Sequence, residues 1–206
     1  MAIFDNLAKE YDTWFYENEN LFNSELDAIK ALMPNFTNAL DIGCGTGIFT
    51  KALGINDGID PSDMMLNIAK MRNLNVKSGS TTSLEIKKGE YDLFTMITVD
   101  CFIEDLNPTF KSLASKLNKG GYLLIAFLNK DTELGAMYEA TKNDSEYYKH
   151  SYFHSDKEIV ECAKSHGFSL VRGINTIYTL DNVYQHYYEG FNKGVFSIAL
   201  LRKEEE

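Results

Sequence analysis

One short glycine-rich stretch constrains the fold of this chain more than any other feature. Residues 39–47 read Ala-Leu-Asp-Ile-Gly-Cys-Gly-Thr-Gly. Leu40 and Ile42 favour a buried strand, and the alternating glycines permit positive φ and let a ligand lie against the main chain. Residues 48–53 have helical character, so the first N–H groups of a helix point back at the loop. We predict a strand, a ligand-binding turn and a helix, because glycines inside a unit that binds nothing would only cost stability.

Two cofactor-binding motifs could explain this turn. The nicotinamide dinucleotide fingerprint requires G-x-G-x-x-G, but Ile48 stands where its last glycine should be. The chain has G-x-G-x-G instead, and the acid Asp41 ends the strand before it. This D-I-G-C-G-T-G pattern resembles motif I of the class I S-adenosylmethionine (SAM)-dependent methyltransferases. The resemblance implies SAM as cofactor and S-adenosylhomocysteine as product, and leaves a nicotinamide-dependent oxidoreductase as a minor alternative.

The resemblance also implies a set of cofactor-binding residues in the first half of the chain. Asp60 ends a short second strand, 17 residues after Gly43. A carboxylate at this position can accept hydrogen bonds from both ribose hydroxyls, whereas an isolated aspartate would more simply be a turn residue. Ser62 can cap the next helix. The expected cofactor contacts of this region are Asp41, Gly43, Cys44, Gly45, Gly47, Asp60, Pro61 and Met65.

A third strand over residues 75–78 leads to the expected adenine contacts. In the family an acid commonly follows the glycine here and accepts a hydrogen bond from the adenine amino group. Ser80 occupies that position in this chain, and a neutral hydroxyl accepts such a bond more weakly. The role of its side chain is therefore open, while Gly79, Ser80 and Thr81 can contribute backbone contacts.

The fourth strand, expected over residues 91–97, leads into the region where methyl transfer would occur. Ligands of open α/β sheets lie at the carboxyl ends of the strands, so Thr98, Val99 and Cys101 are expected to line the methionine part of SAM and face the acceptor. The run K-L-N-K-G-G-Y-L-L-I-A, residues 116–126, resembles the segment before the family's fifth strand. The resemblance covers residues 3–130.

Apolar residues at helical spacing, beginning with Ile3 and Phe4, predict helix over residues 3–33. Asn18–Asn20 divide this helix, and a proline ends it. Residues 4–15 resemble the segment that covers the cofactor in many small-molecule methyltransferases, in which the tyrosine matching Tyr11 approaches the carboxylate of SAM. Ordinary core packing explains Tyr11 and Trp14 equally well.

The implied fold is an α/β, Rossmann-like class I methyltransferase sandwich. Its seven-stranded, mostly parallel sheet has the order 3-2-1-4-5-7-6, with strand 7 antiparallel and helices on both faces. We expect one domain over residues 1–206: a helical cap (1–35), a SAM-binding core (36–130) and a substrate-side half with aromatic insertions (131–206). The last two strands are expected over residues 168–180 and 194–202, and further helices over 107–117, 132–142 and 155–165.

Aromatic residues in the second half suggest where the acceptor binds. Several follow the fifth strand, and others lie in residues 181–191, which join the last two strands. Both segments should reach the carboxyl-end face, where aromatic walls could exclude water from the methyl group. The expected acceptor-binding residues are Trp14, Cys101, Tyr148, Tyr184 and Tyr187. The alternative is that these rings pack the insertions onto the core or form a dimer contact.

The chemistry requires little of the protein beyond positioning. The sulfonium already activates the methyl group, so a base is needed only for an acceptor that must lose a proton early. The candidates are Asp100, His150 and His154, although each histidine alone is more typical of a surface or capping position. No metal is expected, since the acids near residue 100 form no ligand triad and the three cysteines lack metal-site spacing.

Charge limits the class of acceptor. The net charge of −10 disfavours nucleic acid, and there is neither an apolar run of membrane-spanning length nor a signal peptide. We therefore expect a cytoplasmic monomer or homodimer that methylates a small molecule and has no nucleic-acid or membrane partner. A SAM-binding regulatory or assembly protein without catalysis is the alternative from a different class.

Overall fold

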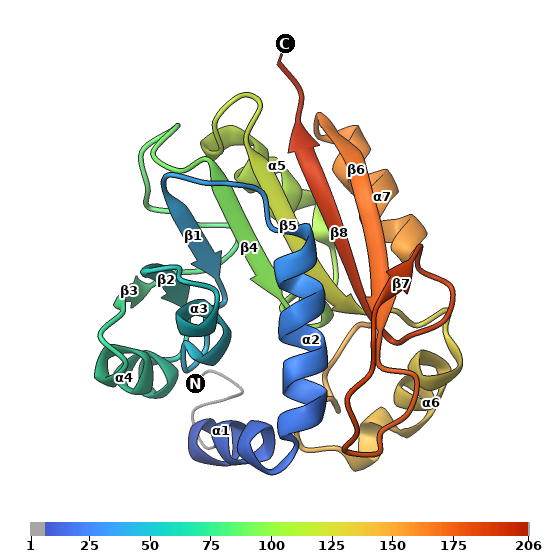
Figure 1. The fold of residues 1–206 in the computed structure, drawn as a ribbon. Helices are drawn as coiled ribbons and strands as arrows, with labels where there is room; N and C mark the ends of the chain where they lie inside the picture. The colour runs from blue at the N-terminus through green and yellow to red at the C-terminus, as the bar shows by residue number, and fades with distance from the viewer. Residues whose placement is uncertain (1–6, 206) are drawn as a thin grey trace.

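The structure is a computed structural model that describes residues 7–205, apart from the side chain of Lys9 (Figure 1). The expected helical residues Ile3 and Phe4 lie outside the described residues. A helical cap follows, as predicted, and Asn18 divides it into two helices: α1 (Ala8–Glu17) and α2 (Glu19–Leu32). The backbone leaves the helical region at Met33, directly before the proline that the sequence identified as a helix terminator.

Within the described residues, one sheet has the strand order β3-β2-β1-β4-β5-β8-β6-β7. Its strands are β1 (Ala39–Ile42), β2 (Asp57–Asp60), β3 (Asn75–Ser78), β4 (Leu93–Ile97), β5 (Tyr122–Leu128), β6 (Phe168–Thr176), β7 (Tyr188–Glu189) and β8 (Phe196–Lys203). The first five strands are parallel, and β8 runs antiparallel to both β5 and β6. The predicted Rossmann-like order is confirmed.

Two details differ from the prediction. The sheet has eight described strands rather than seven, because Tyr188 and Glu189 pair with β6 inside a segment that was expected to be a loop. The amide of Asn175 donates to the carbonyls of Tyr188 and Gly190 and holds this short strand. The strand expected to reach residue 180 ends at Thr176, because Ile177 adopts φ +63°, a left-handed conformation that interrupts an extended chain.

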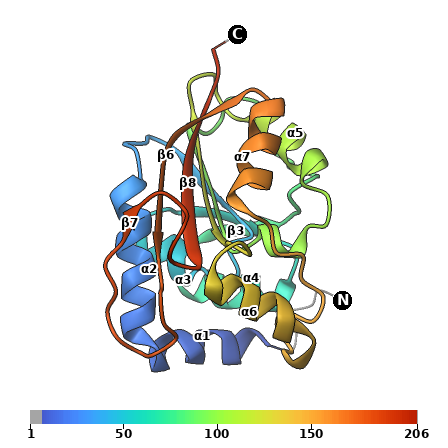
Figure 2. The same cartoon turned by 90° about the vertical axis from the view of Figure 1, so that its right-hand side faces the viewer.

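Helices cover both faces of the sheet, as expected. The other helices are α3 (Ile48–Ala52), α4 (Asp63–Met71), α5 (Leu106–Lys116), α6 (Glu133–Thr141) and α7 (Asp156–Ser165), with short 3-10 turns at η1 (Asp100–Phe102) and η2 (Lys142–Asp144). Alternation along the strands separates two cores: Leu93 and Ile97 pack with α2, whereas Phe94 and Met96 pack with α5. Figure 2 shows α2 and α7 on opposite sides of the sheet.

The parallel strands all point toward one end of the molecule, where α1 and α6 lie in both views (Figures 1 and 2). Side-chain caps start the neighbouring helices at the positions that the sequence indicated. The hydroxyl of Ser62 accepts from the N–H of Met65, and Ser155 forms a reciprocal capping box with Glu158. The residues that follow the carboxyl ends of the strands are therefore held by the sheet on one side and by capped helices on the other.

Candidate functional site

The glycine loop after β1 uses its glycines for two different purposes. A Cβ on Gly43 would lie 2.4 Å from a methyl carbon of Val99, and one on Gly47 would lie 2.3 Å from a methyl carbon of Leu74. These two glycines let the loop pack against protein. Among the described residues, a Cβ on Gly45 would meet nothing closer than a sulfur at 4.0 Å. Gly45 alone of the three therefore faces open space, where a ligand can approach the backbone.

Asp60 at the end of β2 holds this loop in place. The N–H of Gly45 donates to Oδ2 of Asp60 over 2.9 Å, and the N–H of Ser62 donates to Oδ1 over 2.8 Å. The two carboxylate oxygens of Asp60 thus orient the backbone on both sides of the space in front of Gly45. The sulfur in front of Gly45 belongs to the buried Met65, whereas Pro61 is exposed. Gly45, Asp60 and Met65 thus border one open space.

Asp41 lies beneath the loop. Its side chain is buried, and its carboxylate accepts hydrogen bonds from the hydroxyls of Thr50 and Thr95 over 2.5 and 2.7 Å. Burial raises the pKa of Asp41 to about 6, against the opposing effect of the two hydroxyls. Cys44 is also buried, and desolvation raises the pKa of its thiol. Asp41 therefore fixes β1, α3 and β4 relative to one another from below the glycine loop.

A polar clamp that the sequence did not reveal joins α1 to the loop. The carboxylate of Asp12 accepts from the hydroxyl of Thr46 over 2.6 Å and from the guanidinium of Arg72 over 2.7 Å. Arg72 also donates to the backbone carbonyl of Thr46 over 2.8 Å. The three residues lie in α1, in the glycine loop and directly after α4, so the contacts among them could not be predicted from the sequence.

The expected adenine-side residues follow β3. The N–H of Gly79 donates to the carbonyl of Asp60 over 3.3 Å. The hydroxyl of Ser80 lies 2.9 Å from that of Ser83, and the hydroxyl of Thr81 lies 2.9 Å from that of Thr109. Both side chains are partly exposed and contact neighbouring hydroxyls. Because β2 and β3 are adjacent parallel strands, Asp60 and this polar turn lie at neighbouring strand ends.

The chain leaves β4 in a strained conformation. Thr98 has φ +52°, a region that β-branched residues rarely enter and that costs about 1–3 kcal/mol. Its N–H donates to the carbonyl of Ala126 on β5 over 2.7 Å, and its carbonyl accepts from the buried thiol of Cys101 over 3.5 Å. The next residue, Val99, packs against Gly43. Such strain concentrates at functional sites, and here it bends the chain beside the glycine loop.

Asp100 is an unusual buried acid. Its side chain is fully buried, and neither carboxylate oxygen has a hydrogen-bond partner among the described residues. Burial raises the pKa of Asp100 to about 8, and the nearby backbone amides of Asp100 and Cys101 oppose the shift only in part. At neutral pH this carboxyl therefore mostly keeps its proton.

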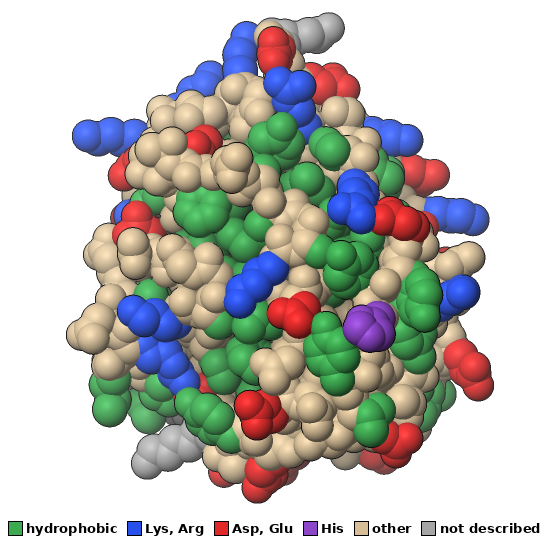
Figure 3. All heavy atoms as spheres, viewed as in Figure 1, with side chains coloured by type: hydrophobic (Ala, Val, Ile, Leu, Met, Phe, Trp, Pro, Cys, Tyr) green, Lys and Arg blue, Asp and Glu red, His purple; other side chains and the backbone are tan. Residues whose placement is uncertain are grey.

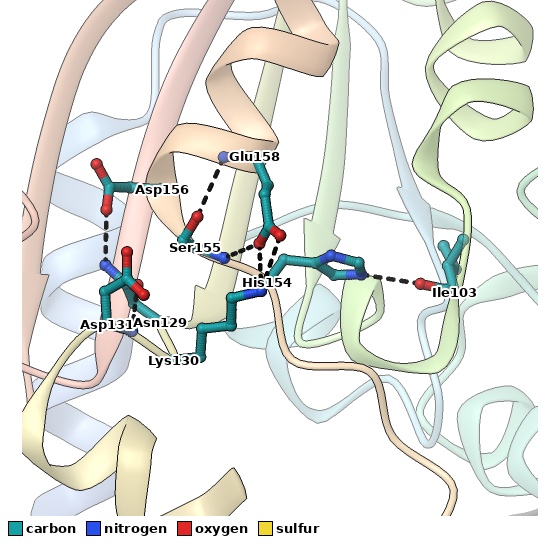
Figure 4. Close-up of polar contacts among 8 residues, drawn as sticks. All are labelled: Ile103, Asn129, Lys130, Asp131, His154, Ser155, Asp156 and Glu158. Carbon is teal, nitrogen blue, oxygen red and sulfur yellow. Dashed lines mark hydrogen bonds and ion pairs between the residues drawn. The ribbon is translucent and has the colours of Figure 1, made fainter.

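The two candidate histidines differ in their surroundings. His150 is exposed. The Nε2 atom of His154 lies 2.8 Å from the carbonyl of Ile103 (Figure 4), so this nitrogen carries a proton and donates. The same close-up shows Glu158 paired with Lys130 beside it. His154 therefore joins the chain after η1 to the start of α7, and its Nε2 is not available as a base.

The structure brings together only some of the expected acceptor-binding residues. Tyr148 packs edge-on against Tyr138, with ring centroids 5.6 Å apart, and tilted against Phe153 at 5.4 Å. Tyr148 packs against the same apolar cluster that contains the buried Cys101. Trp14, by contrast, leaves 41% of its surface exposed on α1.

Tyr184 and Tyr187 belong to a different surface. The hydroxyl of Tyr184 donates to Asp27 on α2 over 2.9 Å, and the exposed fractions of Tyr184 and Tyr187 are 43% and 39%. Figure 3 shows hydrophobic side chains mixed with charged ones on this face. No hydrogen bond or ring contact among the described residues joins either tyrosine to Tyr148, and the segment 181–191 bonds to α2 through Tyr184 and Gln185.

No three histidine, cysteine, aspartate or glutamate side chains of residues 7–205 lie close enough to hold a metal ion. No described helix combines the length and the apolar character that a membrane span requires.

Comparisons with known proteins agree on one family. A family model described as a methyltransferase domain matches residues 16–172. An uncharacterized protein of Methanocaldococcus jannaschii is 37% identical over 198 residues, which cover 95% of this chain and 96% of the relative. The crystal structure of a SAM-dependent methyltransferase from Thermotoga maritima, described as a possible histamine N-methyltransferase, has a TM-score of 0.94 and 31% identity over 98% of this chain and 99% of that one.

A more distant structure shows the fold alone. The magnesium protoporphyrin IX methyltransferase of Synechocystis, solved with bound S-adenosylhomocysteine, has a TM-score of 0.67 and 16% identity, covering 98% of this chain and 96% of that one.

Proposed function

The chain belongs to the class I SAM-dependent methyltransferase family, and we propose that it transfers the methyl group of SAM to a small-molecule acceptor. The observation that carries this proposal is the open space in front of Gly45, bordered by Asp60 and Met65. The family uses SAM as its cofactor. Because Gly45 has no Cβ, SAM could approach the backbone here, whereas a side chain at this position would occupy the space.

Several residues around this space are suited to hold the cofactor. Asp60 ends β2 beside the space, where a carboxylate can accept hydrogen bonds from ribose hydroxyls, and its two oxygens orient Gly45 and Ser62. The polar turn from Gly79 to Thr81 lies at the next strand end for the adenine. The side chain of Tyr11 lies close enough to Asp60 and Asp41 for their charges to raise its pKa, which supports its place beside the cofactor. When bound, SAM supplies an electrophilic methyl group on its sulfonium.

The acceptor would approach from the side of η1 and α6. Thr98 turns the chain beside the glycine loop, and Tyr148 lies near Cys101. These residues would position the acceptor and exclude water, which is the main requirement of a methyl transfer. Of the candidate bases, His154 is engaged at Nε2, His150 is exposed, and Asp100 is fully buried and mostly protonated at neutral pH.

A small molecule is the acceptor class that the observations favour. The net charge of −10 opposes binding of nucleic acid. The Thermotoga maritima relative is described as a possible histamine N-methyltransferase, and histamine is a small amine.

The proposal is tested in two stages. Isothermal titration should show binding of SAM and of S-adenosylhomocysteine; no binding at millimolar SAM, or tighter binding of NAD, would contradict the proposal. Labelled SAM is then incubated with the protein and with separate small-molecule, RNA and protein fractions of a cell extract. Label should enter the small-molecule fraction. Binding of SAM without transfer to any fraction would favour the alternative, a regulatory or assembly protein.

A further inference from the structure

Three tyrosines pack against the apolar cluster that also contains one face of α2, the helix that carries Glu25. Glu25 comes from α2, Tyr11 from α1, Tyr138 from α6, and Tyr148 follows η2. The charge of Glu25 raises the pKa of each of the three phenols, so all three lie within its electrostatic reach. We call these four residues the Glu25 box. Figures 1 and 2 place α1 and α6, which supply two of its members, at the same end of the sheet.

The walls of the Glu25 box are aromatic. Tyr138 and Tyr148 meet edge-on at 5.6 Å, and both lie against Phe153, at 6.1 and 5.4 Å between ring centroids. Tyr11 packs edge-on against Phe15 at 5.0 Å. These rings pack on the apolar core beneath α2. The carboxylate of Glu25 therefore lies in surroundings that are aromatic rather than polar.

Glu25 has no counter-charge among residues 7–205. None of the ion pairs and hydrogen bonds among the described residues involves its carboxylate. The oxygens of Asp100 are inaccessible to solvent, but those of Glu25 are not among the buried unpaired atoms. The Glu25 residue also keeps part of its surface accessible. The hydroxyls of Tyr138 and Tyr148 likewise have no partner among residues 7–205 and are not sealed. The polar groups of the box therefore face a space that solvent, or a ligand, can reach.

An unpaired carboxylate in such surroundings is costly, because little water remains to solvate its charge. This desolvation raises the pKa of Glu25 to about 8. A ligand that brings a positive charge would offset the cost and restore the ionised form. Aromatic rings attract organic cations through their faces, and Tyr hydroxyls can accept hydrogen bonds from an ammonium group.

We propose that the Glu25 box binds the ammonium group of the methyl acceptor, so that the substrate class is a small organic amine. This inference rests on the proposed function, since it places the acceptor opposite the cofactor, with Tyr11 between them. A carboxylate ligand would oppose the ionisation of Glu25 further and would be repelled by the acids near Tyr11, Asp41 and Asp60. A neutral phenol could stack on the rings but would leave Glu25 unpaired.

Binding of simple probes tests the proposal without knowledge of the natural acceptor. The protein is saturated with S-adenosylhomocysteine and titrated with 2-phenylethylammonium and with its neutral counterpart 2-phenylethanol. The wild type should bind the cation about tenfold tighter than the alcohol. Glu25→Gln, which keeps the shape and removes the charge, should abolish this preference and leave the affinity for the alcohol and for SAM unchanged. Glu19→Gln, an exposed acid on the same helix, is the matched control and should behave as the wild type.

A pH titration gives a second readout. Tetramethylammonium keeps its charge at every pH, so its affinity should fall as the pH drops below about 8 and Glu25 takes up a proton. Four other groups of the box and its surroundings, Tyr11, Tyr138, Tyr148 and Cys101, have pKa values that burial raises, and the pKa of the neighbouring Asp100 is raised to about 8. The charges of Asp12, Asp41 and Asp60 also act on Tyr11. The Glu25→Gln variant separates Glu25 from Asp100, since only the Glu25 contribution should disappear.

The outcomes separate the two proposals. Equal binding of the cation and the alcohol by the wild type, or an unchanged preference in Glu25→Gln, would overturn the amine inference. If SAM binds and labelled methyl enters phenols or carboxylic acids but no amine, the amine inference also fails while the proposed function stands. If SAM itself does not bind, the proposed function fails first.

Discussion

The carboxylate of Asp12 lies 2.7 Å from the guanidinium of Arg72, although the two residues are 60 positions apart in the chain. Both side chains are mostly buried, with 14% and 18% of their surfaces exposed. Since Arg72 and Asp12 also bond to Thr46, this pair holds α1 against the glycine loop. These polar contacts thus attach α1 to the glycine loop.

We expect Asp12→Ala and Arg72→Ala each to lower the free energy of unfolding by about 1–3 kcal/mol, because each leaves a charged partner in a partly buried position. Amide hydrogens of α1 should exchange faster in both variants, whereas those of β5 should be unaffected. The double variant should show a coupling energy above about 0.5 kcal/mol. Additive effects of the two substitutions would mean that the pair does not hold the helix.

Asp60→Ala should weaken SAM binding by about 1–3 kcal/mol, because the ribose hydroxyls lose a charged acceptor and the N–H of Gly45 loses its partner. Asp60→Asn keeps one acceptor oxygen and should lose less. Isothermal titration measures both. Asp63→Asn, at an exposed position of α4, is the control and should bind as the wild type does. An unchanged dissociation constant in Asp60→Ala would make Asp60 a turn residue only.

Gly45→Ala and Gly54→Ala form a matched pair. Both glycines have positive φ, +54° and +73°, and a Cβ on Gly54 would meet nothing within 4 Å. Each substitution should therefore cost about 1–2 kcal/mol of stability through the backbone alone. Only Gly45→Ala should also weaken SAM binding, by at least about tenfold, and the bulkier Gly45→Val should abolish it. Retained affinity in Gly45→Val would show that the loop stands away from the cofactor.

The buried carboxyl of Asp100 predicts a pH dependence of stability. Its pKa is raised to about 8 in the folded protein, so between roughly pH 4 and 8 the folded chain binds a proton that the unfolded chain has released. The free energy of unfolding should therefore fall as the pH rises through this window. Asp100→Asn cannot ionise and should be more stable than the wild type at pH 8 by about 1–3 kcal/mol, with little difference near pH 4.

Denaturant unfolding at several pH values, without SAM, measures this difference. Asp41 and Glu25, whose pKa values are also raised, contribute slopes of the same sign in both proteins and cancel in the comparison. A constant difference between wild type and Asp100→Asn across the pH range would mean that Asp100 does not titrate in this window.

Tyr148→Ala and Tyr187→Ala should separate the two aromatic segments. Tyr148 lies in the cluster near Cys101, whereas Tyr187 is exposed beside α2. With an acceptor found by the labelled-SAM assay, Tyr148→Ala should lower the rate of methyl transfer at least about tenfold and leave SAM affinity unchanged. Tyr187→Ala should affect neither. Equal losses in both variants would show that the segment 181–191 does reach the acceptor.

Short sequence patterns predicted the parts of the fold that depend on local geometry. The run D-I-G-C-G-T-G specified a strand, a turn with positive φ and a helix, because only glycine adopts these backbone angles without strain. Caps at Ser62 and Ser155 and the apolar periodicities placed the helices for the same reason: each signal lies within a few residues of the feature that it determines. The strand order followed from the family resemblance that these patterns carried.

The relations between distant segments were decided only by the tertiary structure. Glu25 reads in the sequence as one more polar residue of an amphipathic helix, and nothing near it indicates that three tyrosines from other elements face it. The clamp of Asp12, Thr46 and Arg72 is equally invisible, as is the pairing of Tyr188 with β6. Periodicity tells which side of a helix or strand is apolar, but not which side chain of another element it meets. That choice is made by the packing of the whole chain, in which each polar group must find a partner or a ligand.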